Sequence, residues 1–255
     1  MKFELYTLLT KGNTEGLNRF ITENLQNDKT GKFAITKTPV LFSLGKETGK
    51  LLVKEGVYPV ETLEKWWMQS LASKQNLVLG LASGREIRLI IIGILHVFSK
   101  KQPSLTRSFI QKILNTIEDW ETCDQLALRV IVNLALQNRD ACFSSLRQWA
   151  KPDNKWIRRL AVATIPPYIR AKPEEAQFCL TFLEKFMEEK DRGVQKAIGW
   201  ALREISKKNP SAVFEFLKKH ATNANKDTAR IIKEGMKKLP GEQQETLKDL
   251  LSHEN

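Results

Sequence analysis

The sequence predicts an all-α fold, an α-solenoid in which helix pairs stack into a superhelix with a concave inner surface. From about residue 60 onward, apolar residues recur at intervals of three and four, as in Leu63, Trp66 and Trp67, which is the spacing of one face of an α-helix. Prolines lie near the expected helix starts or breaks, and no long alternating strand pattern follows residue 60. Apolar helical segments also recur at a spacing of about 35 to 37 residues, which suits one helix pair per repeat.

The repeated segments are apolar helices with polar residues near their starts, and each follows another helix-like segment. They are residues 85–95, 123–136, 155–165, 194–205 and 229–239. A helix pair this short cannot bury its apolar face alone, whereas stacked neighbours can. A compact helical bundle is the alternative arrangement of the same helices.

The first 60 residues depart from this pattern. The run Phe33–Phe42 has the composition of a strand, but Pro39 interrupts it. We therefore expect a short hairpin or loop at residues 30–45. This divergent part is expected to belong to the same single domain, residues 1–255.

Two further segments are assigned no function. The segment GKETGK (45–50) matches a phosphate-binding loop only in part, because three residues rather than four separate its glycines and Leu51 follows its lysine. The last residues, 241–255, have the pattern of a capping helix with a polar outer face, which a solenoid needs for solubility.

The composition narrows the class of protein. With 42% hydrophobic residues the chain is too apolar to be disordered, and its net charge of +12, with a pI near 9.6, favours an anionic partner such as nucleic acid. An ordinary basic surface is the alternative explanation of that charge.

The cysteines, histidines and apolar runs suggest a cytoplasmic protein without a metal. Cys123, Cys142 and Cys179 form no close pair and are expected to be reduced thiols, and the three histidines lack metal-ligand spacing. The N-terminus has acidic and polar residues too early for a signal peptide. The most apolar run, residues 89–98, is far shorter than the ~20 residues of a membrane span, so we expect no membrane association.

A column of charged residues runs through the repeats at intervals of 35 to 37 residues. Its members are Arg88, Asp124, Arg159, Lys196 and Lys233. Because equivalent positions of stacked repeats line up, the four cations predict a track for a phosphate backbone. Asp124 is anomalous there, since it would repel phosphates. A helix cap, or an ion pair with Arg159, is the alternative interpretation of Asp124.

Two tryptophans accompany this column. Trp120 precedes Asp124 by four residues and would share its helix face, and Trp200 follows Lys196 by four. Aromatic rings beside an isolated carboxylate predict a water-poor cleft on which a cationic base stacks. The remaining four tryptophans are expected in the core: Trp66, Trp67, Trp149 and Trp156.

Three segments together resemble the AlkD-type DNA alkylation repair family. They are DWETCD (119–124), KWIRRLAV (155–162) and VQKAIGWALREISKKNPSAVFEF (194–216). The resemblance covers roughly residues 80 to 240. It implies a HEAT-like repeat superhelix with a concave basic groove. It also implies a monomeric, nucleoid-associated DNA glycosylase that removes cationic N3- and N7-alkylated purines from double-stranded DNA in base excision repair, without a cofactor or metal.

The resemblance also implies roles for individual residues. Asp124 resembles the catalytic aspartate, Trp120 and Trp200 the two tryptophans beside the lesion, and Arg159 the arginine that holds the backbone near the scissile bond. The residues expected to bind DNA are Arg88, Arg158, Lys196, Arg230 and Lys233. The family's aromatic residue from an N-terminal helix has no clear counterpart; Phe33 and Phe42 are the candidates.

The chemistry of the lesion explains these residue types. An alkylated purine is already cationic, so it leaves without a general acid, and a fixed carboxylate meets the positive charge that grows on the deoxyribose. The alternative functions are a non-catalytic binder of damaged or branched DNA, for which the divergent N-terminal part is an argument, and a protein-binding scaffold.

Overall fold

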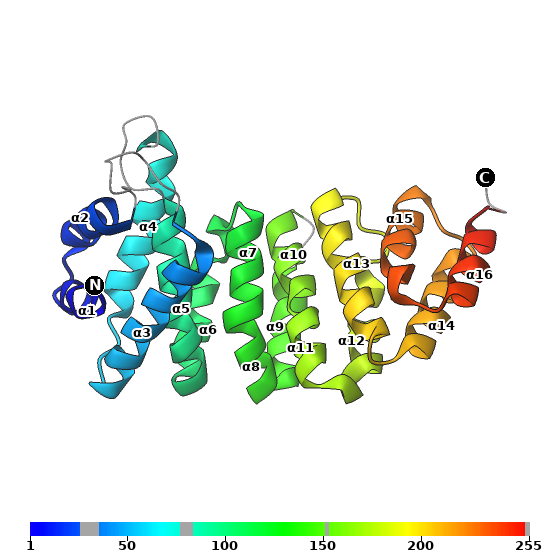
Figure 1. The fold of residues 1–255 in the computed structure, drawn as a ribbon, viewed down its shortest axis with the longest axis horizontal. Coiled ribbons are helices and arrows are strands. Elements are labelled where there is room, and N and C mark those ends of the chain that lie inside the picture. The colour runs from blue at the N-terminus through cyan, green and yellow to red at the C-terminus, as the bar shows by residue number, and fades with distance from the viewer. Residues whose placement is uncertain (26–35, 77–83, 151–152, 253–255) are drawn as a thin grey trace. The chain divides into compact units, whose positions relative to one another are not determined.

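The chain is helical in the computed structural model, which describes residues 1–25, 36–76, 84–150 and 153–252 (Figure 1). Within these residues there is no strand, which confirms the predicted all-α class. The chain forms two compact units, Met1–Leu134 and Ala135–Asn255. None of the described helices is long and apolar enough to cross a membrane.

The first unit is built around helix α5. Its helical elements are α1 (Lys2–Thr10), α2 (Thr14–Leu25), α3 (Thr38–Lys54), α4 (Val60–Asn76), α5 (Gly84–Lys101), α6 (Pro103–Ile113), the 3-10 turn Leu114–Thr116, α7 (Trp120–Leu126) and the π-helical turn Ala127–Ile131. Helix α8 (Val132–Gln137) spans the sequence boundary between the units. Helices α3, α4, α6 and α7 all pack against α5, whose apolar residues from Ile87 to Phe98 are buried on nearly every side.

Helix α3 occupies most of the segment for which we expected a hairpin or loop. Residues 38–45 are helical, so that prediction is wrong for them, while residues 30–35 lie outside the described residues. The error has a physical cause, because Pro39 stands in the first turn of α3, where proline favours a helix start rather than a break.

The glycines of the GKETGK segment allow α3 and α5 to touch backbone to backbone. A Cβ on Gly45 would lie 2.0 Å from the carbonyl oxygen of Ile90, and one on Gly93 would lie 2.5 Å from that of Phe42. A Cβ on Gly49 would likewise lie 3.1 Å from the backbone of Ile94. The segment is therefore a helix-crossing motif, which explains its glycines without a nucleotide.

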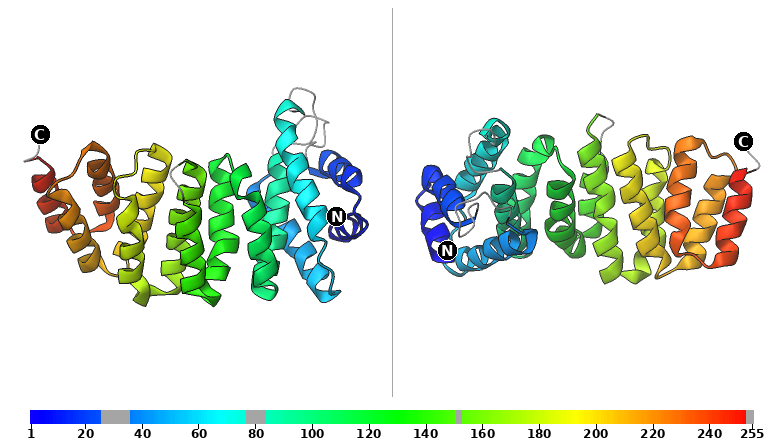
Figure 2. Two further views of the ribbon diagram at one scale, coloured as in Figure 1. Left: turned by 180° about the vertical axis from the view of Figure 1, so that it is seen from behind. Right: turned by 45° about the horizontal axis from the view of Figure 1, so that its top comes forward.

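The second unit consists of stacked helix pairs. Its elements are α9 (Arg139–Trp149), α10 (Lys155–Ala163), α11 (Ile165–Ala171), the 3-10 turn Pro173–Glu175, α12 (Ala176–Leu183), the 3-10 turn Glu184–Phe186, α13 (Arg192–Ser206), α14 (Pro210–Ala221), α15 (Lys226–Gly235), the 3-10 turn Met236–Lys238 and α16 (Gly241–Ser252). Helices α10, α13 and α15 pack side by side in one layer, and α12, α14 and α16 in the other (Figures 1 and 2). This is the arrangement that the repeat spacing predicts.

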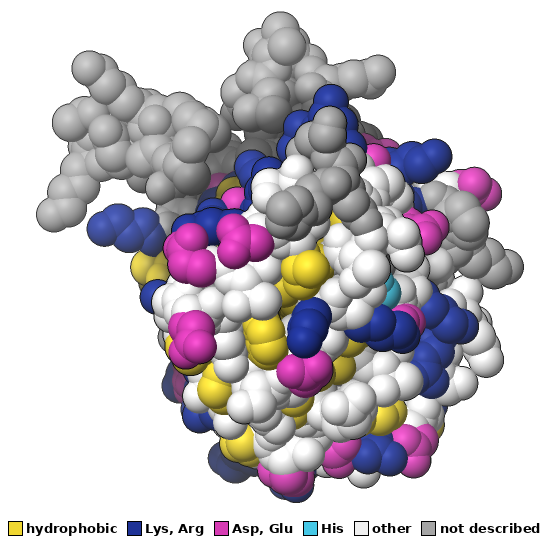
Figure 3. Space-filling model, turned by 90° about the vertical axis from the view of Figure 1, so that its right-hand side faces the viewer, with side chains coloured by type: hydrophobic (Ala, Val, Ile, Leu, Met, Phe, Trp, Pro, Cys, Tyr) yellow, Lys and Arg dark blue, Asp and Glu magenta, His cyan; other side chains and the backbone are white. Residues whose placement is uncertain are grey.

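Helix α16 closes this unit as a cap. Only Leu247 and Leu251 are buried, and they face the stack. Figure 3 shows one face of the molecule, on which lysine or arginine and acidic side chains lie around a few hydrophobic ones.

A side-chain cap begins the corresponding helix of each repeat. Asp119, Asn154, Asp191 and Asn225 each accept a hydrogen bond from a backbone N–H two or three residues later, at the starts of α7, α10, α13 and α15. These caps recur at 35, 37 and 34 residues. They satisfy donors that a helix start otherwise leaves unpaired.

The caps define the register of the charged column. The fifth residue after each cap is Asp124, Arg159, Lys196 and Arg230 in turn. Arg230 therefore stands at the equivalent position in the last repeat, where the sequence spacing had suggested Lys233. The 34-residue interval before Asn225 causes this difference.

The tryptophans assigned to the core divide into two groups. Trp66 and Trp67 are fully buried in the first unit, as predicted. Trp149 and Trp156 are only half-buried, so the core prediction is wrong for them. The Lys155 ammonium lies 5.0 Å from the centre of the Trp156 ring, which shows that this indole reaches the surface.

Candidate functional site

Trp120 and Asp124 lie on one face of α7 in the first unit, as predicted. The cap residue Asp119 accepts hydrogen bonds from the backbone N–H and the hydroxyl of Thr122, both at 2.7 Å, and so fixes where α7 begins. Trp120 is the first helical residue and 62% exposed, whereas Asp124, one turn later, is half-buried. Asp124 is therefore not sealed in the interior.

A cavity of about 600 Å³ opens in front of Trp120. It is lined by Leu71, Arg85, Arg88, Asn115, Thr116, Glu118, Asp119, Trp120 and Glu121. The indole thus shares this cavity with two arginines and three carboxylates. Asp124 does not line it.

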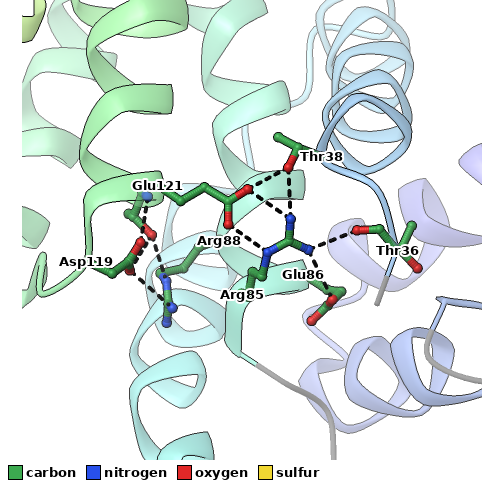
Figure 4. Close-up of polar contacts among 8 residues, drawn as sticks. Thr36, Thr38, Arg85, Glu86, Arg88, Asp119 and Glu121 are labelled. Atoms are coloured by element: carbon green, nitrogen blue, oxygen red, sulfur yellow. Dashed lines mark hydrogen bonds and ion pairs between the residues drawn. The ribbon is translucent and has the colours of Figure 1, made fainter. Parts of the chain in front are cut away.

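Arg85, which the sequence analysis missed, holds the carboxylate next to Trp120. Its Nε and Nη2 donate to the two oxygens of Glu121 at 2.7 and 2.8 Å (Figure 4). Burial alone would raise the pKa of Glu121, but hydrogen bonds from Arg85 and Thr38 outweigh it and hold the pKa below its ordinary value. Burial would also lower the pKa of Arg85, and the pairing with Glu121 raises it instead. Both partners are ionised at neutral pH.

Arg88 holds the carboxylate on the other side of Trp120. Its Nε donates to the hydroxyl of Thr122 at 3.1 Å, its Nη2 lies 3.5 Å from Asp119 Oδ2, and its Nη1 donates to the carbonyl of Ser70 at 3.4 Å. Burial lowers the pKa of this guanidinium, against the attraction of Asp119. Its predicted contact with phosphate stays a prediction, and its observed contacts are with α7 and α4.

In the second unit, Arg158 and Arg159 connect α10 to the next repeat. Arg158 donates through Nε and Nη2 to Glu189 at 2.7 and 3.0 Å, and the Glu189 side chain is only 6% exposed. Arg159 Nη1 donates to the carbonyl oxygen of Gly193 at 2.6 Å, in the first turn of α13. The predicted DNA contacts of both arginines remain predictions.

The structure brings three predicted DNA-binding residues together. Lys196, Arg230 and Lys233 line a cavity of about 240 Å³ between α13 and α15, with Arg192, Gln195 and Glu234. Arg230 donates to Asp227 at 2.7 Å, and the two lysines are exposed. Arg192 was missed by the sequence analysis, although its place directly after the cap Asp191 is a signal that could have found it.

Comparison with known proteins identifies the family of the chain. The chain matches the family model described as DNA alkylation repair enzyme over residues 59–239. The chain belongs to this family. Two solved structures are similar: AlkD2 from Streptococcus mutans, at 16% identity over 90% of this chain and 100% of that chain with a TM-score of 0.61, and smu.31 from Streptococcus mutans UA159, at 18% identity over 80% and 99% with a TM-score of 0.54. They show the shared helical-repeat fold, and none of the curated proteins matches.

Trp200 lies on α13 and is half-buried. It is the second tryptophan that the resemblance places beside the lesion. The guanidinium of Arg170 lies 6.0 Å from the centre of its ring, within the range of a cation–π contact. Arg170 is itself paired with Glu204 at 2.9 Å. The Trp200 ring therefore already has a cationic neighbour in its own unit.

Phe42 is one of the two candidates for the N-terminal aromatic residue that the resemblance implies. Phe42 stands on α3, where the guanidinium of Arg129 lies 4.5 Å from its ring centre and His96 contacts it edge-on at 5.4 Å. Phe33 lies outside the described residues. Within the part of the chain that is described, no group of three or more histidine, cysteine or acidic side chains could hold a metal ion.

Proposed function

We propose that this alkylation repair protein is a monofunctional DNA glycosylase that excises cationic N3- and N7-alkylated purines from double-stranded DNA. The observation that carries the proposal is the pairing of a half-buried carboxylate, Asp124, with an exposed indole, Trp120, on one face of α7. A cationic base is attracted to the face of an indole, and a carboxylate stabilises a neighbouring positive charge.

The proposed reaction needs a carboxylate and water. The bond between C1′ and the purine nitrogen breaks, and the base keeps the electron pair and leaves neutral. Positive charge grows on the deoxyribose, where Asp124 stabilises it. Water then adds to C1′ and releases a proton. No protonation of the base is required, because alkylation has already made it cationic.

Release of methylated bases tests this proposal. Genomic DNA treated with a methylating agent is incubated with the protein, and the free bases are separated by chromatography. We expect 3-methyladenine and 7-methylguanine in the soluble fraction and no release of unmodified purines. If the duplex is bound and no base is released, the chain is a non-catalytic binder of damaged DNA.

Phosphate binding is proposed for the cationic cluster of α13 and α15. Each lysine that neutralises a phosphate releases a condensed counterion, so the Lys196→Ala variant is expected to reduce the slope of log K against log salt concentration by about 0.9. A salt titration of binding to a short duplex measures this. The matched control is Lys248→Ala on α16, an exposed lysine paired with Glu245, which should leave the slope unchanged. Equal slopes for Lys196→Ala and wild type would remove Lys196 from the interface.

A further inference from the structure

We propose that Arg85 is a positioning residue of the alkylation-repair site. It holds Glu121 at the start of α7 so that the neighbouring indole of Trp120 keeps a fixed orientation, and it makes no contact with DNA. The inference rests on the proposed function, because it assigns Arg85 a role in that reaction.

The two residues that flank Trp120 are each held by an arginine of α5. The Glu121 carboxylate accepts hydrogen bonds from two nitrogens of Arg85, a two-point contact that we call a fork (Figure 4). The Asp119 carboxylate is paired with Arg88, one turn further along α5. Trp120 thus lies between these two anchored residues in the sequence. We call this pair of contacts the α7 clamp.

The hydrogen bonds of Arg85 decide between positioning and phosphate binding. A guanidinium has five N–H groups. The structure gives Arg85 five hydrogen bonds, two to Glu121 and one each to the hydroxyl of Thr38, the carbonyl of Thr36 and the carboxylate of Glu86. The donors are therefore used within the protein, and none is left for a phosphate oxygen.

The same contacts join three separate parts of the first unit. Thr36 and Thr38 lie at the start of α3, Glu86 is a buried residue of α5, and Glu121 lies in the first turn of α7. Thr38 completes the network by donating its hydroxyl to Glu121 at 2.5 Å. Arg85 thus fixes α7 against two neighbouring helices. Two of its partners are largely shielded from solvent, since the side chains of Glu86 and Glu121 are 1% and 19% exposed.

The cap Asp119 fixes where α7 begins, and the α7 clamp adds a restraint on the turn that carries Trp120. Helix α7 continues through the π-helical turn Ala127–Ile131 into α8, so Trp120 lies in the first turn of a longer helical segment, where a helix frays most readily. Trp120 is too exposed for packing to fix its ring. A clamp on both neighbours of Trp120 supplies the missing constraint.

A double-mutant cycle tests the route by which Arg85 acts. The Arg85→Met variant is expected to lower the single-turnover excision rate of 7-methylguanine by about tenfold or more while the Kd for the duplex stays within about twofold. In a Trp120→Ala background the same substitution should change the rate by less than about threefold, because the group it positions is gone. The Arg85→Lys variant should recover only part of the rate, since an ammonium cannot form the fork. Loss of duplex affinity with an unchanged rate, or full additivity with Trp120→Ala, would overturn the proposal.

A second readout does not depend on catalysis. Protein labelled with 5-fluorotryptophan gives a ¹⁹F resonance for each indole, and the Trp120 signal is assigned with Trp120→Phe. Arg85→Met should shift or broaden that signal and leave those of Trp156 and Trp200 in place. The control is Arg139→Met, which removes an arginine whose Nη1 donates to both oxygens of Glu175 in the second unit, and it should leave the Trp120 signal unchanged.

The two readouts separate the inference from the proposed function. If no base is released by any variant but the Trp120 resonance moves in Arg85→Met, the glycosylase proposal fails and the clamp stands. If excision occurs but the resonance does not move, the clamp is rejected. Should Arg85→Met not fold, Glu121→Gln keeps the side-chain volume and one acceptor and is expected to move the same resonance by a smaller amount.

Discussion

The Asp124→Asn variant is expected to lose about 10² to 10³ in single-turnover excision rate, the range that removal of one preorganised electrostatic group causes. Asparagine has nearly the same shape as aspartate and keeps α7 intact, but it cannot oppose a positive charge on the deoxyribose. The affinity for the duplex is expected to stay the same or rise, because a negative charge beside the phosphates is removed. Single-turnover release of 7-methylguanine and a binding titration measure the two effects.

Asp249→Asn on α16 is the matched control for this substitution. Asp249 is an exposed acid in the second unit, and its conversion should change neither rate nor affinity. Wild-type release of 7-methylguanine by Asp124→Asn would remove Asp124 from the mechanism, whatever its place on α7.

The second large effect concerns stability. The Gly45→Ala variant is expected to lose about 3 kcal/mol in the free energy of unfolding, at the upper end of the cost of overpacking a core. The added methyl would lie 2.0 Å from the carbonyl oxygen of Ile90, which belongs to the backbone of α5 and cannot rotate away as a side chain could. The two helices must separate, and that weakens the central contact of the first unit.

Urea unfolding followed by tryptophan fluorescence detects this loss, since Trp66 and Trp67 are buried in the same unit. Gly241→Ala is the control, because a Cβ there meets nothing within 4 Å at the start of α16. It should leave stability unchanged or raise it by up to about 1 kcal/mol. Equal midpoints for wild type and Gly45→Ala would show that α3 and α5 do not touch as closely as these glycines allow.

Local sequence patterns are sufficient to locate the helices that carry the candidate site. The spacing of apolar residues locates α5, α7, α10, α13 and α15, and the recurring caps from Asp119 to Asn225 set where four of these helices begin. The four-residue interval between Trp120 and Asp124 already places both on one helix face. Helix periodicity and capping act over a few residues, so they can be recognised in the chain itself.

Tertiary packing decided the partners of the arginines and the nature of the N-terminal segment. Arg85 and Glu121 are 36 residues apart, and Arg158 and Glu189 are 31 apart, so their forks exist only because neighbouring helices pack in one register. The glycines at 45 and 93 have no local signature of a helix crossing, because a glycine that breaks a helix and one that admits a second backbone look the same in sequence. The distinction depends on which helix packs against the glycine, and that is decided by the burial of side chains across the whole unit.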